Sequence, residues 1–279
     1  MSPAVKSAAR KSGSFLRWLI VAASAAVILP NWPATADAPP LKVCADPDNM
    51  PFSNRAEEGF ENRLAELLAE KIGTKVAYTW RPLGIGFVRQ TLLRGRCDVI
   101  IGHVRDHVQV RETAPYYASG YVLVTRSSGP LAGVTNLEDA RLEDATLGVI
   151  VGSPPAARLA QTGLIGQAKP YRLLVDRRHD GPSEQMIDDV LQGRTDGALM
   201  WGPAGGVLAR QSDGQLVATV LTESRDAPDM ADEISLSVRG NDRVMFSILN
   251  RVIEVHSSEI KTLLSDAGVP VLTIGADTH

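Results

Sequence analysis

The side chains best placed to bind a ligand follow predicted strands. Asp46 follows a strand over residues 41–45, His103 follows one over 99–101, and Trp201 follows one over 198–200. In open α/β sheets, the carboxyl ends of strands border the crevice that takes the ligand. We therefore predict a ligand or partner cleft. Its predicted lining residues are Asp46, Asn49, Met50, His103, Arg105, Ser153 and Trp201.

Some of these side chains allow a second interpretation. Asp46 could cap its own loop as readily as it could anchor a ligand. Met50, Tyr116 and Trp201 could meet a protein partner at the mouth of the cleft, since Met and aromatic side chains are enriched in interface cores. Tyr116 and Trp201 could equally pack between two lobes.

Patterns that would indicate catalysis or a metal site are incomplete. His103 and His107 have the spacing of a shared metal on a helix, but they fall in a predicted loop. Asp46 and Asp48 lack the glycine and closing glutamate of a calcium loop. The acidic run from Asp226 to Glu233 fits a solvated surface loop. The sequence contains no nucleophile elbow, phosphate loop or zinc-protease motif. We predict no catalytic residue, no bound metal and no enzymatic activity.

The elements that must position the cleft alternate from Leu41 onward, in a pattern that occurs twice. The first series predicts strands over 41–45, 75–80, 99–101 and 121–125 and helices over 60–72 and 87–94. The second predicts strands over 147–151, 172–175, 198–200, 216–221 and 234–238 and helices over 154–162, around 186–191, after Asn241 and over 259–265. Such alternation indicates parallel sheets with right-handed crossovers.

We therefore predict an α/β chain of two lobes, with two parallel-rich sheets, a cleft and two hinge crossings. Lobe 1 is predicted over 37–126 plus about 234–279, and lobe 2 over about 130–225. The glycine- and proline-containing stretch 127–134 suits the first crossing, and the charged stretch 223–233 suits the return.

The first 36 residues have the pattern of a secretory signal peptide. Basic residues precede the apolar run Trp18–Leu29, and Ala34-Thr35-Ala36 supplies a cleavage site after Ala36. A membrane anchor is the alternative, although the run is shorter than the ~20 residues that a span needs. The mature chain would carry a net charge of −7, because the leader holds four of the 29 basic residues and no acid. That charge disfavours nucleic acid and anionic membranes as partners.

The cysteine count agrees with export. Cys44 and Cys97 are the only two cysteines, and both follow the leader. An even count in an oxidising compartment favours a disulfide, and two buried thiols are the alternative. The predicted strands place Cys97 about three residues further from the cleft than Cys44. A bond therefore requires the chain before Asp98 to fold toward the first strand.

Several ordered motifs resemble a known family. Residues 42–46, 51–53 and 59–62 resemble the start of a type II periplasmic solute-binding protein, and 97–102 and 147–153 continue the likeness. Five motifs resemble the branch associated with quinoprotein (PQQ) dehydrogenases, the J proteins encoded beside methanol dehydrogenases. They are Val43-Cys44-Ala45-Asp46-Pro47, Gly59-Phe60-Glu61-Asn62, Thr79-Trp80-Arg81-Pro82, Gly86-Phe87-Val88-Arg89 and Met200-Trp201-Gly202-Pro203.

The resemblance implies a type II periplasmic-binding-protein fold and a periplasmic accessory role in methanol oxidation. Its implied partners are a PQQ-dependent alcohol dehydrogenase and its cytochrome c. The partner would carry PQQ and a metal ion, and this chain no cofactor of its own. The alternative is the substrate-binding component of an ABC importer for a small solute other than an amino acid.

The cleft departs from the amino-acid binders of this superfamily. Neither Arg105 nor Arg111 stands at the offset expected for the arginine that pairs with an α-carboxylate. Pro154 and Pro155 remove backbone donors from the helix start that would receive the same anion. Trp201 occupies the position of the acid that holds the ammonium group. We therefore expect no binding of common amino acids.

Overall fold

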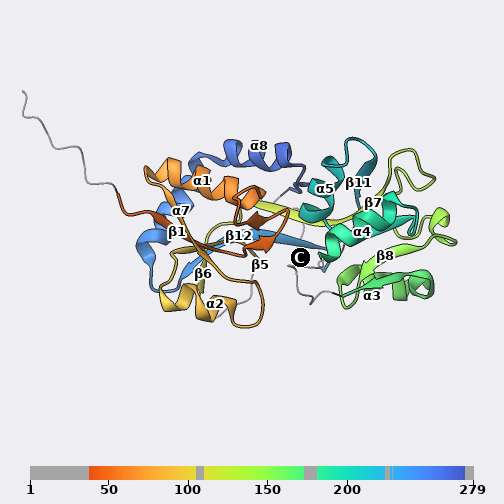
Figure 1. The fold of residues 1–279 in the computed structure, drawn as a ribbon, viewed down its shortest axis with the longest axis horizontal. Helices are drawn as coiled ribbons and strands as arrows, with labels where there is room; N and C mark the ends of the chain where they lie inside the picture. The colour runs from red at the N-terminus through yellow and green to blue at the C-terminus, as the bar shows by residue number, and fades with distance from the viewer. Residues whose placement is uncertain (1–37, 105–109, 173–180, 224–226, 228, 274–279) are drawn as a thin grey trace, which may run out of the picture. The chain divides into compact units, whose positions relative to one another are not determined.

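The computed structural model describes residues 38–104, 110–172, 181–223, 227 and 229–273 (Figure 1). Asp37–His279 form one compact unit. The predicted signal peptide and its cleavage position lie outside the described residues. Within the described ranges, no helix is long and apolar enough to cross a membrane.

Three parallel strands begin the main sheet. β1 (Leu41–Ala45) lies between β4 (Val76–Trp80) and β5 (Val99–Val104). The apolar side chains of β1 and β5 are buried on both faces of the sheet, as continuous apolar runs in parallel sheets commonly are. The small hairpin of β2 (Asp48–Asn49) and β3 (Ser53–Asn54) follows β1.

Each face of these strands packs against different helices. Val43 and Val99 join a core with α1 (Phe60–Ile72), α7 (Arg243–Val255) and α8 (Ser257–Ala267). Cys44 and Ile100 face α2 (Phe87–Gln90) and the short 3₁₀ turn η1 (Leu92–Arg94). Figure 1 shows α1 and α8 above the strands and α2 below them. The alternation of side chains along a strand therefore assigns one helix layer to each face.

Cys44 and Cys97 are bonded, with 5.5 Å between their Cα atoms, and the structure contains no free cysteine among the described residues. Cys44 pairs in register with Ile100, so Cys97 lies before the paired part of β5. The backbone N–H of Asp98 donates to the carbonyl of Lys42 (2.7 Å), which brings this approach segment against β1. The chain before Asp98 therefore folds toward β1, as the predicted offset between the two cysteines requires for a bond.

Two long strands connect the halves of the sheet. β7 (Tyr117–Arg126) pairs antiparallel with β12 (Ala231–Arg239) through its first residues and with β10 (Gly197–Trp201) through its later ones. The sheet is consequently continuous, in the order β4-β1-β5-β12-β7-β10-β8-β9, with β6 (Val110–Glu112) on β12 and β11 (Leu216–Val220) on β7. The two predicted parallel groups exist, joined by these antiparallel pairs.

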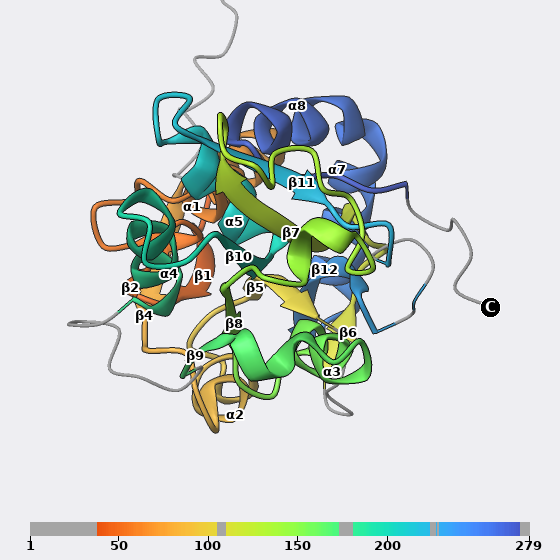
Figure 2. The same cartoon turned by 90° about the vertical axis from the view of Figure 1, so that its right-hand side faces the viewer.

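The second half repeats the layered plan (Figure 2). β8 (Leu147–Ile150) pairs in parallel with β10 and with β9 (Lys169–Tyr171). Two clusters of buried side chains lie in this half, one around Leu123 and Leu199 and the other around Val122 and Met186. The helical segments of this half are η2 (Ala140–Leu142), α3 (Pro154–Gln161), η3 (Leu164–Gln167), α4 (Pro182–Leu191) and α5 (Gly202–Arg210).

The predicted first crossing over 127–134 is wrong. Leu131 and Val134 pack in the second half with Leu123, so the chain has already crossed along β7. The return falls at the end of the predicted stretch 223–233, because Met230 packs in the second half and Ile234 in the first. The exact residues at which each lobe begins and ends stay a prediction.

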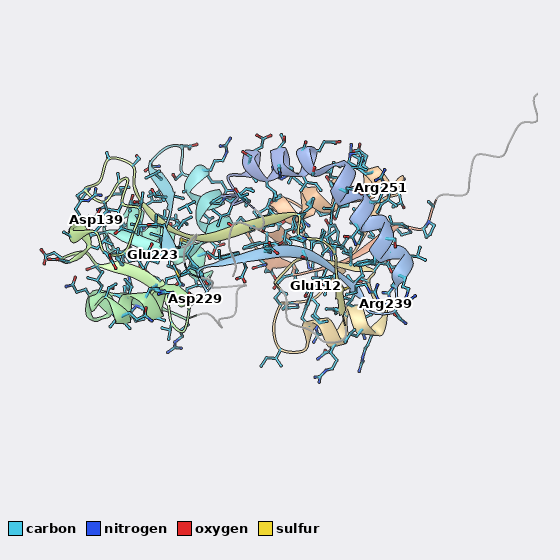
Figure 3. The ribbon with its side chains drawn as sticks, turned by 180° about the vertical axis from the view of Figure 1, so that it is seen from behind. Glu112, Asp139, Glu223, Asp229, Arg239 and Arg251 are labelled. Atoms are coloured by element: carbon cyan, nitrogen blue, oxygen red, sulfur yellow. A yellow bond between two sulfur atoms is a disulfide. The ribbon has the colours of Figure 1, made fainter. Side chains whose placement is uncertain are left out.

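Polar contacts attach the return segment to the second half. The Glu223 carboxylate accepts from the backbone N–H of Leu137 (2.7 Å), and Asp229 pairs with Arg158 (2.7 Å). Figure 3 shows Glu223 and Asp229 on the same half of the ribbon. Asp229 remains exposed, as predicted for the acidic run, but it has a cationic partner.

Other differences from the sequence prediction are local. The helix predicted over 87–94 is interrupted at Thr91, whose backbone leaves the helical region. β9 lies at Lys169–Tyr171, ahead of the strand predicted over 172–175, of which residues 173–175 lie outside the described part. α7 is capped by the side chain of Asp242, which accepts from the Met245 N–H, and not by Asn241. α5 was not predicted.

Candidate functional site

A cavity of about 620 Å³ opens beside the ends of β1, β5, β8 and β10, within the size range of small-ligand sites. Its walls are mostly apolar. One wall comes from the β2–β3 hairpin, the first turn of α1, the β4–α2 loop and β5; the other comes from Ile150, the start of α4, Trp201 and Ala204. The cavity lies where the predicted cleft was placed.

Asp46 builds this site without lining it. Its carboxylate accepts from the backbone N–H groups of Asp48 (2.9 Å) and Leu83 (2.7 Å), and it is 3% exposed. Asp46 therefore ties the β2–β3 hairpin to the β4–α2 loop, and both contribute to the wall. Of the two interpretations of Asp46, loop capping is the one that its hydrogen bonds support.

Three of the seven predicted residues line the cavity together. They are Asn49, Met50 and Trp201. The Trp201 ring also meets Tyr121 edge-on, with 5.4 Å between ring centroids, and packs against the core of the first half. Trp201 therefore both lines the site and packs across the β7–β10 pair.

The remaining predicted residues divide into two groups. Ser153 precedes α3 and donates its hydroxyl to the carbonyl of Ile150 (2.7 Å), so it shapes the end of β8 and is not among the lining residues. The side chain of His103 and all of Arg105 lie outside the described residues, as does His107. Tyr116, expected at the cleft mouth or in lobe packing, is buried in the core of the first half.

Glu61 is the lining residue that sequence reasoning missed. It lies in the first turn of α1 and is half-buried. Its carboxyl sits directly over the Cα of Gly102 on β5, where a Cβ would come within 1.9 Å of Glu61 Oε1. Gly102 also has a positive φ of 71°. The only sequence signal was the Gly59-Phe60-Glu61 motif, which gives no hint that Gly102 is its neighbour.

Burial dominates the electrostatics of this carboxyl. It raises the pKa of Glu61 to about 8, because the charged form is poorly solvated and no ion pair compensates within the described residues. Burial also raises the pKa of the Tyr116 hydroxyl, which lies beside Glu61 and the backbone of Gly102. Burial thus favours the protonated form of the Glu61 carboxyl over the anion.

The charged and titratable side chains lining the cavity are all acidic among the described residues. Asp48 and Glu61 lie on one wall and Glu184 on the other, and no described Lys, Arg or His joins them. The described residues also contain no cluster of His, Cys, Asp and Glu able to hold a metal ion. The described part of these walls offers no cation to an anionic ligand, whereas it would suit a neutral or cationic apolar ligand.

The fold and the interlobe cavity define the class of a two-lobed solute-binding protein. The matching family model, bacterial extracellular solute-binding proteins of family 3, covers residues 41–263. The chain belongs to this family, and within it to the MxaJ/XoxJ-like type II periplasmic binding proteins.

Three similar proteins support this placement. Protein MoxJ of Methylorubrum extorquens is 30% identical over 86% of this chain and 84% of its own length. Protein MoxJ of Paracoccus denitrificans is 27% identical over 91% of this chain and 96% of its own. The crystal structure of the periplasmic binding protein XoxJ from Methylobacterium extorquens AM1 has a TM-score of 0.70 and 37% identity, covering 84% of this chain and 99% of that one.

Proposed function

We propose that this protein is a periplasmic accessory protein of a PQQ-dependent, methanol-type alcohol dehydrogenase, acting in its assembly or activation. The observation that carries the proposal is the similarity to MoxJ and XoxJ proteins over more than four fifths of the chain. The leader over residues 1–36, with cleavage after Ala36, would deliver it to the compartment of the dehydrogenase.

The cavity supports a role other than amino-acid capture. A free amino acid needs a cation for its α-carboxylate, and no described wall residue supplies one. An acid in place of Trp201 would hold its ammonium group, and that position is aromatic. The chain itself would bind neither PQQ nor a metal; the dehydrogenase, and in electron transfer its cytochrome c, would carry the redox groups.

A two-lobed protein suits this role because its halves are joined chiefly by two strands. β7 and β12 carry the chain between the halves, and the cavity lies between their walls. Binding an immature partner across both walls would shift the population of closed forms by the partner's preference for them. The accessory protein would thereby hold the partner until its cofactor is bound.

The test is a deletion strain grown on methanol, complemented by the full-length gene. We expect periplasmic dehydrogenase activity and PQQ content per dehydrogenase to fall in the deletion strain and to recover on complementation. Normal growth, activity and cofactor loading in the deletion strain, with no second gene of this family present, would refute the accessory role.

A further inference from the structure

Exposed apolar side chains stand in or next to the segments that line both walls of the cavity. Ile85 is 97% exposed and stands between two lining residues, Gly84 and Gly86. Leu83, 47% exposed, lines the cavity on the same wall. Val151, 58% exposed, follows the lining residue Ile150 on the other wall. We call Leu83, Ile85 and Val151 the apolar rim.

The apolar rim indicates an occupant larger than the cavity. A small solute enclosed by the cavity would leave the rim in water, where large apolar side chains are unfavourable. An extended polypeptide segment could instead place one side chain in the cavity and cover the rim with its neighbours. Side chains from such a segment commonly alternate between pockets and flanking surface.

The wall of the cavity that carries Glu61 suits a positively charged group. Glu61 has no hydrogen bond or ion pair among the described residues, and its carboxyl occupies the space over Gly102 that a Cβ at that position would take. Glu61 also lines the cavity, so an incoming group can reach it. Without a cation, burial favours the neutral form of this carboxyl, and a cation supplied by a ligand would favour the charged form and pair with it.

We propose that the cavity receives a basic side chain of the partner polypeptide, which pairs with Glu61 while the flanking apolar side chains cover the rim. This inference rests on the proposed function for the identity of the partner. It adds the chemistry of the recognised segment: a lysine or arginine between apolar residues. Asp48 and Glu184 on the cavity walls reinforce the preference for a positive charge.

The first experiment compares three blocked peptides of the form Ala-Leu-X-Leu-Ala by calorimetry with the mature protein. X is lysine, its neutral analogue norleucine, or glutamate. We expect the lysine peptide to bind about tenfold more tightly than the norleucine peptide, and the glutamate peptide to bind most weakly. Hexylamine tests the cation without a polypeptide, and we expect it to bind more weakly than the lysine peptide.

The Glu61→Gln variant tests the assignment, with Glu66→Gln on the exposed side of α1 as its matched control. Glu61→Gln should reduce the lysine preference to less than about twofold, while Glu66→Gln should preserve it. Ile85→Ser should weaken the lysine peptide and leave hexylamine unchanged. Equal binding of the lysine and norleucine peptides, or equal effects of the two glutamine variants, would overturn the assignment of Glu61 as the partner of a basic side chain. If hexylamine bound as tightly as the lysine peptide, the claim that the occupant is a polypeptide segment would be refuted.

Proton release gives a second readout. A protonated Glu61 that pairs with a cation must give its proton to the buffer, so binding enthalpies near pH 7 should differ between phosphate and Tris. Among the described residues, the other titratable groups around Glu61 are Asp48, Glu184, Tyr78, Tyr116 and Tyr117. Glu61→Gln should abolish the buffer dependence; its persistence in that variant would assign the proton elsewhere and contradict the proposal.

The deletion strain separates this inference from the proposed function. If the intact gene restores dehydrogenase activity and the Glu61→Gln gene restores it equally, the accessory role holds and the recognition of a basic side chain fails. If deletion has no effect, the accessory role fails whatever the peptides show. Immunoblotting of the periplasmic fraction ensures that the variant is present at the level of the intact protein.

Discussion

Two carboxyls on two helices of this protein have opposite environments. Glu61 lies in the first turn of α1 beside the cavity and has no partner among the described residues. Asp189 lies in the last turn of α4, is 5% exposed, and accepts from Lys169, Tyr171 and Arg194. Burial raises the pKa of Glu61 to about 8. Burial also acts to raise the pKa of Asp189, but its three donors outweigh that effect and lower it to about 2.

Position on the helix would give the reverse order. An acid is favoured at a helix N-terminus and disfavoured at a C-terminus, because of the helix dipole. The neighbours supplied by the rest of the fold outweigh this local effect in both regions. Asp189 uses its charge to fix β9 and the end of α4, whose start forms the second cavity wall. Glu61 has no such partners among the described residues and is available to pair with a ligand. The comparison therefore separates a structural acid from a recognition acid.

The largest expected effect concerns the contacts that stabilise each half internally. The half with Glu61 is fastened covalently by Cys44–Cys97, and the Asp189 region by ionic contacts. Replacing both cysteines by alanine should lower the free energy of unfolding by about 4 kcal/mol, because the unfolded chain regains loop freedom. Urea denaturation of the mature protein measures this. A loss below about 1 kcal/mol would show that the covalent tie matters little to this half.

Breaking the structural acid should have the next largest effect. Asp189→Asn leaves Lys169 and Arg194 without their counterion, and we expect a loss of about 3 kcal/mol. Because both cations are partly exposed, the loss should not exceed this value. The exposed neighbour Asp188→Asn is the matched control and should change stability by less than about 0.5 kcal/mol. Equal effects of the two variants in urea would remove the distinction drawn for Asp189.

The acid limb of the stability curve tests the same region by its sign. The folded pKa of Asp189 lies below the unfolded value of about 3.9, so its contribution is present above that pH and is lost as the pH falls toward about 2. Between those limits, wild type and Asp188→Asn should lose stability with a slope that Asp189→Asn lacks. Parallel slopes in all three proteins would contradict the assigned charge.

Replacing Gly102, which lies beneath the Glu61 carboxyl, should have a smaller effect on the free energy of unfolding. Gly102→Ala introduces a side chain at positive φ and displaces the Glu61 carboxyl, for a loss of about 2 kcal/mol. Gly95→Ala is the control, since its φ is also positive (67°) but its Cβ would meet no atom within 4 Å. Gly102→Ala alone should also lose the lysine preference of the cavity. Retained preference in the folded variant would show that Gly102 does not position Glu61.

The smallest expected change in stability concerns Glu61 itself, and here the variant should be more stable than wild type. Its folded pKa is raised above the unfolded value of about 4.3, so keeping its proton stabilises the fold below that value, and the benefit is lost as the pH rises toward about 8. Glu61→Gln should therefore match wild type near pH 4 and be more stable by about 1 kcal/mol at pH 8, since the cavity partly solvates the carboxyl. Thermal melts across this range measure it, with Glu66→Gln as control. A variant less stable than wild type at pH 8 would reverse the interpretation.

Much of the fold could be predicted because its elements have strong local signals. The strand at 41–45 and the helix at 60–72 occur where the apolar pattern and Gly73 place them. α5 escaped prediction because Gly205 and Gly206 are poor helix formers. The structure explains them: a Cβ on Gly205 would meet Val122 at 2.7 Å, and one on Gly206 would meet the carbonyl of Gly268 at 2.3 Å. Close packing against distant segments selected these glycines.

The site was predictable only in part, for a related reason. Asn49, Met50 and Trp201 were found because the ends of strands border the cleft in this kind of sheet. The same rule could not decide the role of Asp46 or Ser153, because a position at a strand end does not say whether a polar side chain faces the cavity or bonds to its own loop. It could not find Glu61, which lies at the start of a helix.

The sequence by itself determined the alternating elements, the family motifs, the leader pattern and the pairing of the only two cysteines as a hypothesis. These features depend on neighbours along the chain or on composition, so they can be predicted from the sequence. Tertiary structure alone decided that β7 carries the crossing, that α5 packs through its glycines, and that Glu61 meets Gly102 while Asp189 meets three donors. A carboxyl's charge and accessibility depend on atoms brought close from distant parts of the chain, and only the folded chain specifies those atoms.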